Sequence, residues 1–113
     1  MPYIELKTNV SVSADATADL QQMLGREIEL IPGKTEKWLM TAVEGEVAMS
    51  MAGSTEPCAF LAVSIFGAAS PEAYDALTAS LCEKVSATLG VPPDRVYVKY
   101  EEVSTWGWNG MNF

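Results

Sequence analysis

Residues 58–66 read CAFLAVSIF, an apolar run whose length and composition are typical of a buried β-strand. The run ends shortly before Ser70-Pro71-Glu72, a strong helix start because proline at the first helical position loses no hydrogen bond. An apolar stripe at helical spacing then continues to Leu89, and Gly90 with Pro92 ends it. This stretch therefore predicts a strand that leads directly into a long helix.

The same order of elements occurs in the first half of the chain, and the two halves align with a period of about 58 residues. YIELK at 3–7 aligns with LAVSI at 61–65, and GKTEKWLMTAV at 33–43 aligns with VPPDRVYVKYE at 91–101. A helix with Ser13 as its N-cap is predicted to continue to about Leu30, before Pro32-Gly33. The chain therefore predicts two β-α-β units in an α+β fold, with a four-stranded mixed sheet and two helices on one face.

Long strands are predicted at 3–9, 37–43, 58–66 and 95–103. A short strand at 47–51 is expected to form a hairpin with 37–43 through Glu44-Gly45-Glu46. Strands 37–43 and 58–66 are apolar on both faces, so the face without helices is expected to pack against copies of the same chain. The short strand and the tail STWGWNGMNF would then extend a neighbour's sheet edge, and an unusually apolar monomer is the alternative.

Composition narrows the possible functions. The 113 residues fit a single domain, and a net charge of −8 argues against a nucleic-acid or anionic-membrane surface. No apolar run is long enough to span a membrane and no secretory signal is evident, so a soluble, cytoplasmic protein is expected. Cys58 and Cys82 form no CxxC pair, so no redox pair and no metal site are expected.

The absence of histidine directs attention to the N-terminus. No side chain has an unperturbed pKa near 7, whereas an α-amino group has one of about 7.7–8.0. Pro2 would become the first residue if Met1 were removed, and its nitrogen would then be a secondary amine. The alternative is that Pro2 simply begins an edge strand, where it costs no ladder hydrogen bond.

An ordered set of short motifs extends over essentially the whole chain. The motifs are Pro2 at the start, TNV at 8–10, GK at 33–34, GSTEPCAF at 53–60, SIFG at 64–67, PDRVYVKY at 93–100 and WGWNG at 106–110. Together they resemble the macrophage migration inhibitory factor family of the tautomerase superfamily. The resemblance implies a cofactor-free homotrimer with active sites at subunit interfaces, which interconverts the keto and enol forms of phenylpyruvate and related α-keto acids.

The resemblance also assigns roles to individual residues. It implies that Pro2 is the catalytic base and acid, and that Lys34 and the backbone amide of Ile65 bind the substrate carboxylate. Tyr97 would enter a neighbour's pocket as wall and hydrogen-bond partner. Desolvation and the charge of Lys34 would lower the pKa of the Pro2 amine towards neutrality or below. Lys34 as a solvated helix cap and Tyr97 as simple packing are the alternatives.

Several positions depart from the family's usual residues. Lys99 lies where the best-known members have asparagine, and it would either add a second cation to the pocket or pair with a surface acid. Trp38 replaces a common tyrosine and keeps an aromatic wall. Trp106 and Trp108 are expected to anchor the tail on a neighbouring subunit, with Trp108 at the pocket rim, and stacking on an aromatic substrate is the alternative. Leu61 replaces the second cysteine of a pair that the family links to thiol-oxidoreductase activity, so this activity is not expected.

Two further functions remain open at this level. One is a cytokine-like protein that is released without a signal peptide and binds a protein receptor, with a vestigial pocket. The other is a hydratase, dehalogenase or decarboxylase reaction on the same fold, which Lys99 keeps under consideration because such relatives generally have extra cations around the proline.

Overall fold

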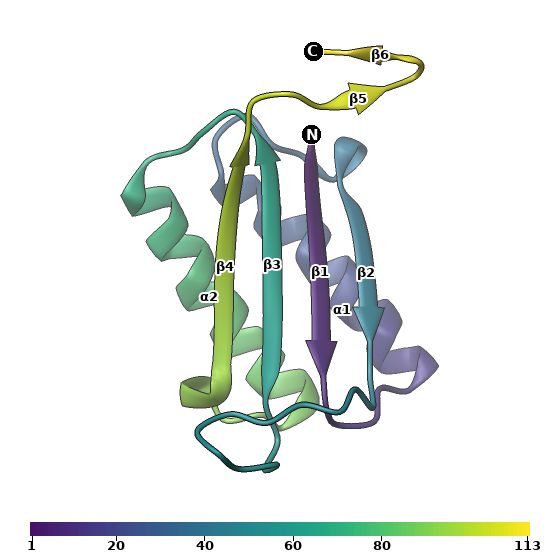
Figure 1. Ribbon diagram of the computed structural model, residues 1–113, viewed down its shortest axis with the longest axis vertical. Coiled ribbons are helices and arrows are strands. Elements are labelled where there is room, and N and C mark those ends of the chain that lie inside the picture. The colour runs from purple at the N-terminus through teal and green to yellow at the C-terminus, as the bar shows by residue number, and fades with distance from the viewer.

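The computed structural model describes residues 1–113 as one sheet layer covered on one face by two helices (Figure 1). The four long strands lie in the order β2-β1-β3-β4, and a two-stranded hairpin follows them at the C-terminus. The elements are, in chain order, β1 Pro2–Thr8, α1 Ala14–Glu27, η1 Ile28–Leu30, η2 Glu36–Trp38, β2 Met40–Glu44, β3 Ala59–Phe66, α2 Pro71–Leu89, η3 Pro93–Arg95, β4 Val96–Val103, β5 Gly107–Trp108 and β6 Met111–Asn112.

The predicted internal repeat is confirmed by the topology. β1 is parallel to β2 and β3 is parallel to β4, with one long helix between the members of each pair. β1 and β3 join the two halves as an antiparallel pair in the middle of the sheet. Even the short turns repeat, because η2 precedes β2 as η3 precedes β4. The chain is therefore two β-α-β units in an α+β fold, as the sequence predicts.

Both helices begin and end for local reasons that the sequence reveals. The side chains of Ser13 and Ser70 each accept a hydrogen bond from a backbone N–H in the first turn of α1 and α2. Gly90 ends α2 in the left-handed conformation, with φ of 73°. The chain after α1 tightens into the 3-10 turn η1 and leaves helical geometry after Leu30, where the sequence predicts the end.

The hydrophobic core lies between the sheet and the helices. Strands β1 and β3 alternate strictly between buried and partly exposed residues, so each gives one side-chain row to the core. Among the side chains with essentially no exposed surface are Ile4, Leu6, Leu61, Val63, Ile65, Leu20, Leu24, Leu77, Leu81 and Val85. This packing fixes the register of the two central strands, because a slip of one residue would turn the apolar row to solvent.

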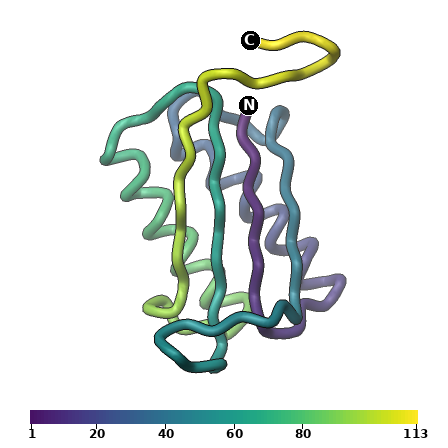
Figure 2. Tube along the Cα trace, in the orientation of Figure 1, coloured from purple at the N-terminus to yellow at the C-terminus, as the bar shows by residue number.

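Two expectations about strands are wrong. The strand predicted at 37–43 begins only at Met40, because residues 36–38 form the turn η2 and place Trp38 outside the sheet. Residues 47–51 do not form a strand, and their only bridge joins Met51 to Ser54. No hairpin forms through 44–46, since β2 pairs with β1 in parallel and the chain then crosses the end of β1, where the Val47 N–H donates to the Thr8 carbonyl (Figure 2).

The face of the sheet without helices is only partly apolar. The β3 residues Phe60 and Ala62 occupy this face, as the alternation predicts. On β1 the Lys7 ammonium lies 3.4 Å from the Glu5 carboxylate, and on β4 Lys99 lies 3.5 Å from Glu101. The charged residues of this face therefore lie on β1 and β4, and not on the two strands that the sequence shows to be apolar on both faces.

None of the helices combines the length and the apolar character needed to cross a membrane.

Candidate active site

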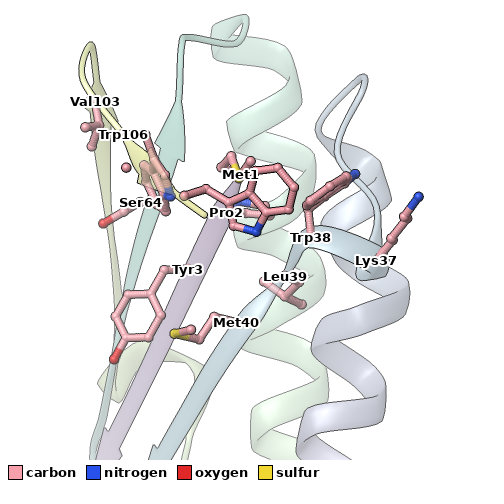
Figure 3. A pocket seen from close by; sticks show the side chains of 12 residues that line it. Met1, Pro2, Tyr3, Lys37, Trp38, Leu39, Met40, Ser64, Val103 and Trp106 are labelled. Carbon is pink, nitrogen blue, oxygen red and sulfur yellow. The ribbon is translucent and has the colours of Figure 1, made fainter. Parts of the chain in front are cut away.

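A pocket of about 730 Å³ opens where the N-terminus, the turn η2 and the C-terminal segment meet (Figure 3). The N-terminus lies beneath the C-terminal hairpin in the ribbon view (Figure 1). Most of the lining side chains are apolar or aromatic. They are Met1, Pro2, Tyr3, Lys37, Trp38, Leu39, Met40, Ser64, Val103, Trp106, Gly107 and Trp108. A mostly apolar hollow with a few polar groups is typical of a small-molecule site.

Pro2 is buried at the start of β1, directly opposite Ile65 of β3. The strand is not the edge strand that the alternative supposed, because β1 lies between β2 and β3. A proline fits this position because it is the first residue of the strand. The same position makes Pro2 a lining residue of the pocket. Its structural role and its predicted chemical role are therefore compatible.

The surroundings of the N-terminus disfavour a protonated amine. The pKa of the Met1 amino group is lowered from its usual 8.0, first by burial and then by the charge and hydrogen bonding of Lys34. Lys34 is held in place by its Nζ, which donates to the carbonyl of Phe66 at 2.8 Å. Lys34 does not line the pocket itself but lies against the end of the chain from which the pocket opens.

The backbone amide that faces the N-terminus belongs to Phe66. Its N–H donates to the Met1 carbonyl at 3.0 Å. Because bonded and non-bonded pairs alternate in an antiparallel ladder, the next pair, Pro2 and Ile65, exchanges no hydrogen bond. The Ile65 N–H therefore points away from β1 towards β4. The sequence holds no signal for this choice, because the alternation of bonded and non-bonded pairs depends on the register of β1 against β3.

Aromatic side chains form a continuous arch beside the N-terminus. The rings of Trp38 and Trp108 meet edge to face with centroids 5.1 Å apart. Trp108 stacks with Phe113 at 6.4 Å, and Phe113 lies 5.6 Å from Phe66. Trp38 and Trp108 remain 40% and 48% exposed, so part of each ring is free to contact a ligand. Through these contacts the C-terminal segment packs on the end of the sheet that carries Pro2.

Two predicted site residues lie elsewhere in the same chain. Tyr97 is 61% exposed and lines a separate cavity of about 340 Å³ with Met49, Met51 and Phe60. This cavity adjoins the beginning of β3 and β4, whereas Pro2 adjoins the end of β3. Lys99 pairs with Glu101 and lies 5.9 Å from the Phe60 ring. One chain thus brings Pro2, Lys34, Ile65, Trp38 and Trp108 together, and it leaves Tyr97 and Lys99 apart from them.

The structure offers no obvious metal centre and no disulfide. No group of three or more His, Cys, Asp and Glu residues is arranged to hold a metal ion. Cys58 and Cys82 are both free, and burial raises the pKa of the Cys82 thiol.

Comparison with known proteins agrees with this architecture. The family model described as macrophage migration inhibitory factor (MIF) matches residues 1–113. The rat (Rattus norvegicus) macrophage migration inhibitory factor is 31% identical over 121 residues, which cover 100% of this chain and 99% of the relative. The factor of Xenopus laevis is 29% identical over 118 residues, with the same two coverages.

Solved structures agree equally well. The crystal structure of Leishmania major MIF2 matches with a TM-score of 0.93 and 31% identity, over 100% of this chain and 97% of that one. The homologue from Prochlorococcus marinus matches with a TM-score of 0.89 and 34% identity, over 98% of both chains. With its two β-α-β units and its N-terminal pocket, the chain belongs to the macrophage migration inhibitory factor family, within the tautomerase superfamily.

Proposed function

We propose that the chain is a keto-enol tautomerase for phenylpyruvate-like α-keto acids, with Pro2 as general base and acid once Met1 is removed. The observation that carries this proposal is the setting of the N-terminus. It combines an apolar pocket, the neighbouring cation Lys34 and a Met1 amino group whose pKa is lowered by burial and by Lys34. Removal of Met1 would expose the Pro2 amine next to the same cation, and since the chain has no histidine, that amine is the group best suited to move protons near pH 7.

In the proposed reaction the free amine of Pro2 removes a proton from the carbon next to the keto group. The electron pair of that C–H bond forms the C=C bond, and the carbonyl π pair moves onto oxygen. The same nitrogen, now protonated, then delivers the proton to the enolate oxygen and returns to its free form. The product is the enol isomer, and the reverse reaction follows the same steps.

The carboxylate of the substrate needs donors close to Pro2, and two are at hand. The Lys34 ammonium is fixed by the Phe66 carbonyl, and the Phe66 N–H donates to the carbonyl of Met1. Removal of Met1 would leave that N–H without its acceptor and beside the new N-terminus. We therefore assign carboxylate binding to Lys34 and the Phe66 amide, which takes the part that the resemblance gave to the Ile65 amide.

The aryl group of the substrate would contact Trp38 and Trp108, whose exposed rings border the pocket. Tyr97 and Lys99 are proposed to reach the same site from a neighbouring copy in a homotrimer. The partly apolar open face of the sheet and segment 47–51, which joins no neighbouring strand, support such an assembly, because both leave surface that a second copy would cover.

The proposal is tested by following the interconversion of enol and keto phenylpyruvate in the ultraviolet. The protein is first shown by intact mass to lack Met1, and its Pro2→Gly variant is assayed beside it. Glycine also allows Met1 to be removed, and circular dichroism verifies that the fold is unchanged. The same chain with Met1 retained is the matched control, since its Pro2 nitrogen is an amide.

Turnover is expected to fall by about 100-fold or more in the Met1-retaining chain, the usual contribution of a general base, because its Pro2 nitrogen is an amide. The Pro2→Gly variant keeps an N-terminal amine but replaces the secondary amine of proline with a primary one, so its turnover should be reduced rather than abolished. If the processed wild type does not turn over phenylpyruvate, or if the Met1-retaining chain is equally active, the proposal is wrong. The first of these results would favour the alternative, a cytokine-like protein that binds a receptor and has a vestigial pocket.

A further inference from the structure

The pocket is electrostatically unusual for this chain. The sequence has 15 acidic and 7 basic residues, yet no aspartate or glutamate lines the pocket. Lys37 is the one lining side chain that is charged at neutral pH. With Lys34 beside the N-terminus, two of the chain's few cations thus lie at one hollow.

Lys37 also lacks an anionic partner. Three lysines, Lys7, Lys84 and Lys99, are paired with carboxylates. Lys34 and Arg95 donate to backbone carbonyls. Only Lys37 and Arg26 have neither a salt bridge nor a side-chain hydrogen bond. The Lys37 ammonium lies instead 5.2 Å from the centre of the Trp38 ring, close enough for a cation–π contact.

The positions of Pro2, Trp38 and Lys37 along the pocket indicate which end of a bound ligand would meet the Lys37 ammonium. Figure 3 shows Pro2 on one side of Trp38 and Lys37 on the other, with the Lys37 ammonium farthest from Pro2. A ligand that contacts the N-terminus with one end and extends along the Trp38 ring therefore brings its far end towards Lys37. That end meets a cation without an acidic neighbour in the lining.

We propose that Lys37 selects substrates with a second carboxylate at the end remote from the keto acid, that is, α-keto dicarboxylates with a flat aryl spacer. This inference rests on the proposed function, because it assumes that the α-keto acid end binds at Lys34 and Pro2. Lys37 acts on binding and takes no part in proton transfer. Its removal should therefore change KM rather than kcat.

The test compares 4-carboxyphenylpyruvate with 4-carbamoylphenylpyruvate, which has nearly the same shape but a neutral far end. Wild type, Lys37→Gln and Arg26→Gln are assayed without Met1. Arg26→Gln is the matched control, since it removes the other unpaired cation and changes the net charge equally. The wild type is expected to prefer the carboxylate, and Lys37→Gln to reduce this preference by about 1.4-fold to fivefold, the range for an exposed ion pair. Arg26→Gln should preserve the preference, which should weaken as salt is added.

The inference is overturned if the wild type has no preference, if Lys37→Gln keeps it, or if Arg26→Gln reduces it equally. Failure of the proposed function would look different, because neither keto acid would then be turned over. In that case calorimetric titration with 4-carboxycinnamate and 4-carbamoylcinnamate, which have no keto group to enolise, gives an independent measure. Tighter binding of the dicarboxylate that depends on Lys37 would support the inference, and equal binding would overturn it.

Discussion

Replacing Lys34 with methionine should change both the rate and its pH dependence. Methionine keeps most of the apolar stem of the side chain but removes the charge that lowers the pKa of the amino-terminal group. An amine next to this cation loses its proton at a lower pH than an isolated amine does. Without the cation its pKa rises, so the acidic limb of the kcat/KM profile should move to higher pH.

The size of the rate effect follows from the lost contact with the substrate. A hydrogen bond to a charged group contributes about 1.5–3 kcal/mol, so kcat/KM for phenylpyruvate should fall by about 10-fold to 150-fold. Loss of the bond from Lys34 to the Phe66 carbonyl should cost about 1 kcal/mol of folding stability, which thermal unfolding would detect.

The assay is the ultraviolet tautomerase rate from pH 5 to pH 9, with Arg26→Met as a control for the change in net charge. Arg26 has no partner and does not line the pocket, so its profile should match the wild type. An acidic limb that stays in place in Lys34→Met, or moves to lower pH, would refute the assignment of Lys34 as the cation beside the base. An unchanged kcat/KM would refute its contact with the carboxylate.

Three further predictions concern the scaffold. Thr8→Val should lower the unfolding free energy in urea by about 1–3 kcal/mol, because the buried hydroxyl donates to the Cys58 carbonyl at 2.7 Å and its replacement also leaves a backbone N–H without its acceptor; equal stability would contradict this. Arg95→Met should speed amide hydrogen exchange within residues 51–57, since the guanidinium makes four hydrogen bonds to carbonyls of that segment. Unchanged protection would show that the segment keeps its structure without these hydrogen bonds. Lys84→Met should destabilise the fold at pH 7, because Lys84 is the main cause of the lowered pKa of Glu27. The loss of stability should shrink below pH 4.5, the ordinary pKa of a glutamate, since the contribution of Lys84 disappears as the carboxylate is protonated. A difference in unfolding temperature from the wild type that stays constant down to pH 3 would contradict this.

The repeat made most of the fold predictable from sequence. Ser13, Ser70 and Gly90 are local signals for helix ends, and they act on the backbone nearest to them. Successive residues of a strand point to opposite faces of the sheet, so CAFLAVSIF divides into two side-chain rows whatever the strand pairs with. Such features depend on near neighbours in the chain and survive in any tertiary context that buries one face.

Errors arose where pairing partners decide the structure. Residues 47–51 have strand-like composition, but the chain crosses the end of β1 there and leaves them without a partner. Trp38 has the character of a strand residue because aromatic residues favour strands, yet it belongs to the turn Glu36–Trp38 that precedes β2. Composition alone does not carry information about either choice.

The site residues could be predicted from sequence only in part, because some of them depend on strand pairing. Pro2, Lys34, Trp38 and Trp108 could be assigned from motifs, and they gather at one end of the sheet. The choice between the Ile65 and Phe66 amides depends on the hydrogen-bonded parity of the β1–β3 pair, which only the register gives. Lys37 cannot be singled out from the sequence, because an exposed lysine there is indistinguishable from any other solvated charge.

The central claim is that the nitrogen of Pro2 is a free amine whose lowered pKa lets it act as a base near neutral pH. It is tested most directly by ¹⁵N NMR of protein labelled at proline, freed of Met1, and titrated from pH 4 to pH 10. The account predicts that the Pro2 nitrogen titrates below the ordinary α-amino range of about 7.7–8.0 and at the same pH as the acidic limb of kcat/KM. A nitrogen that titrates at or above that range, or at a pH unrelated to the rate profile, would contradict it.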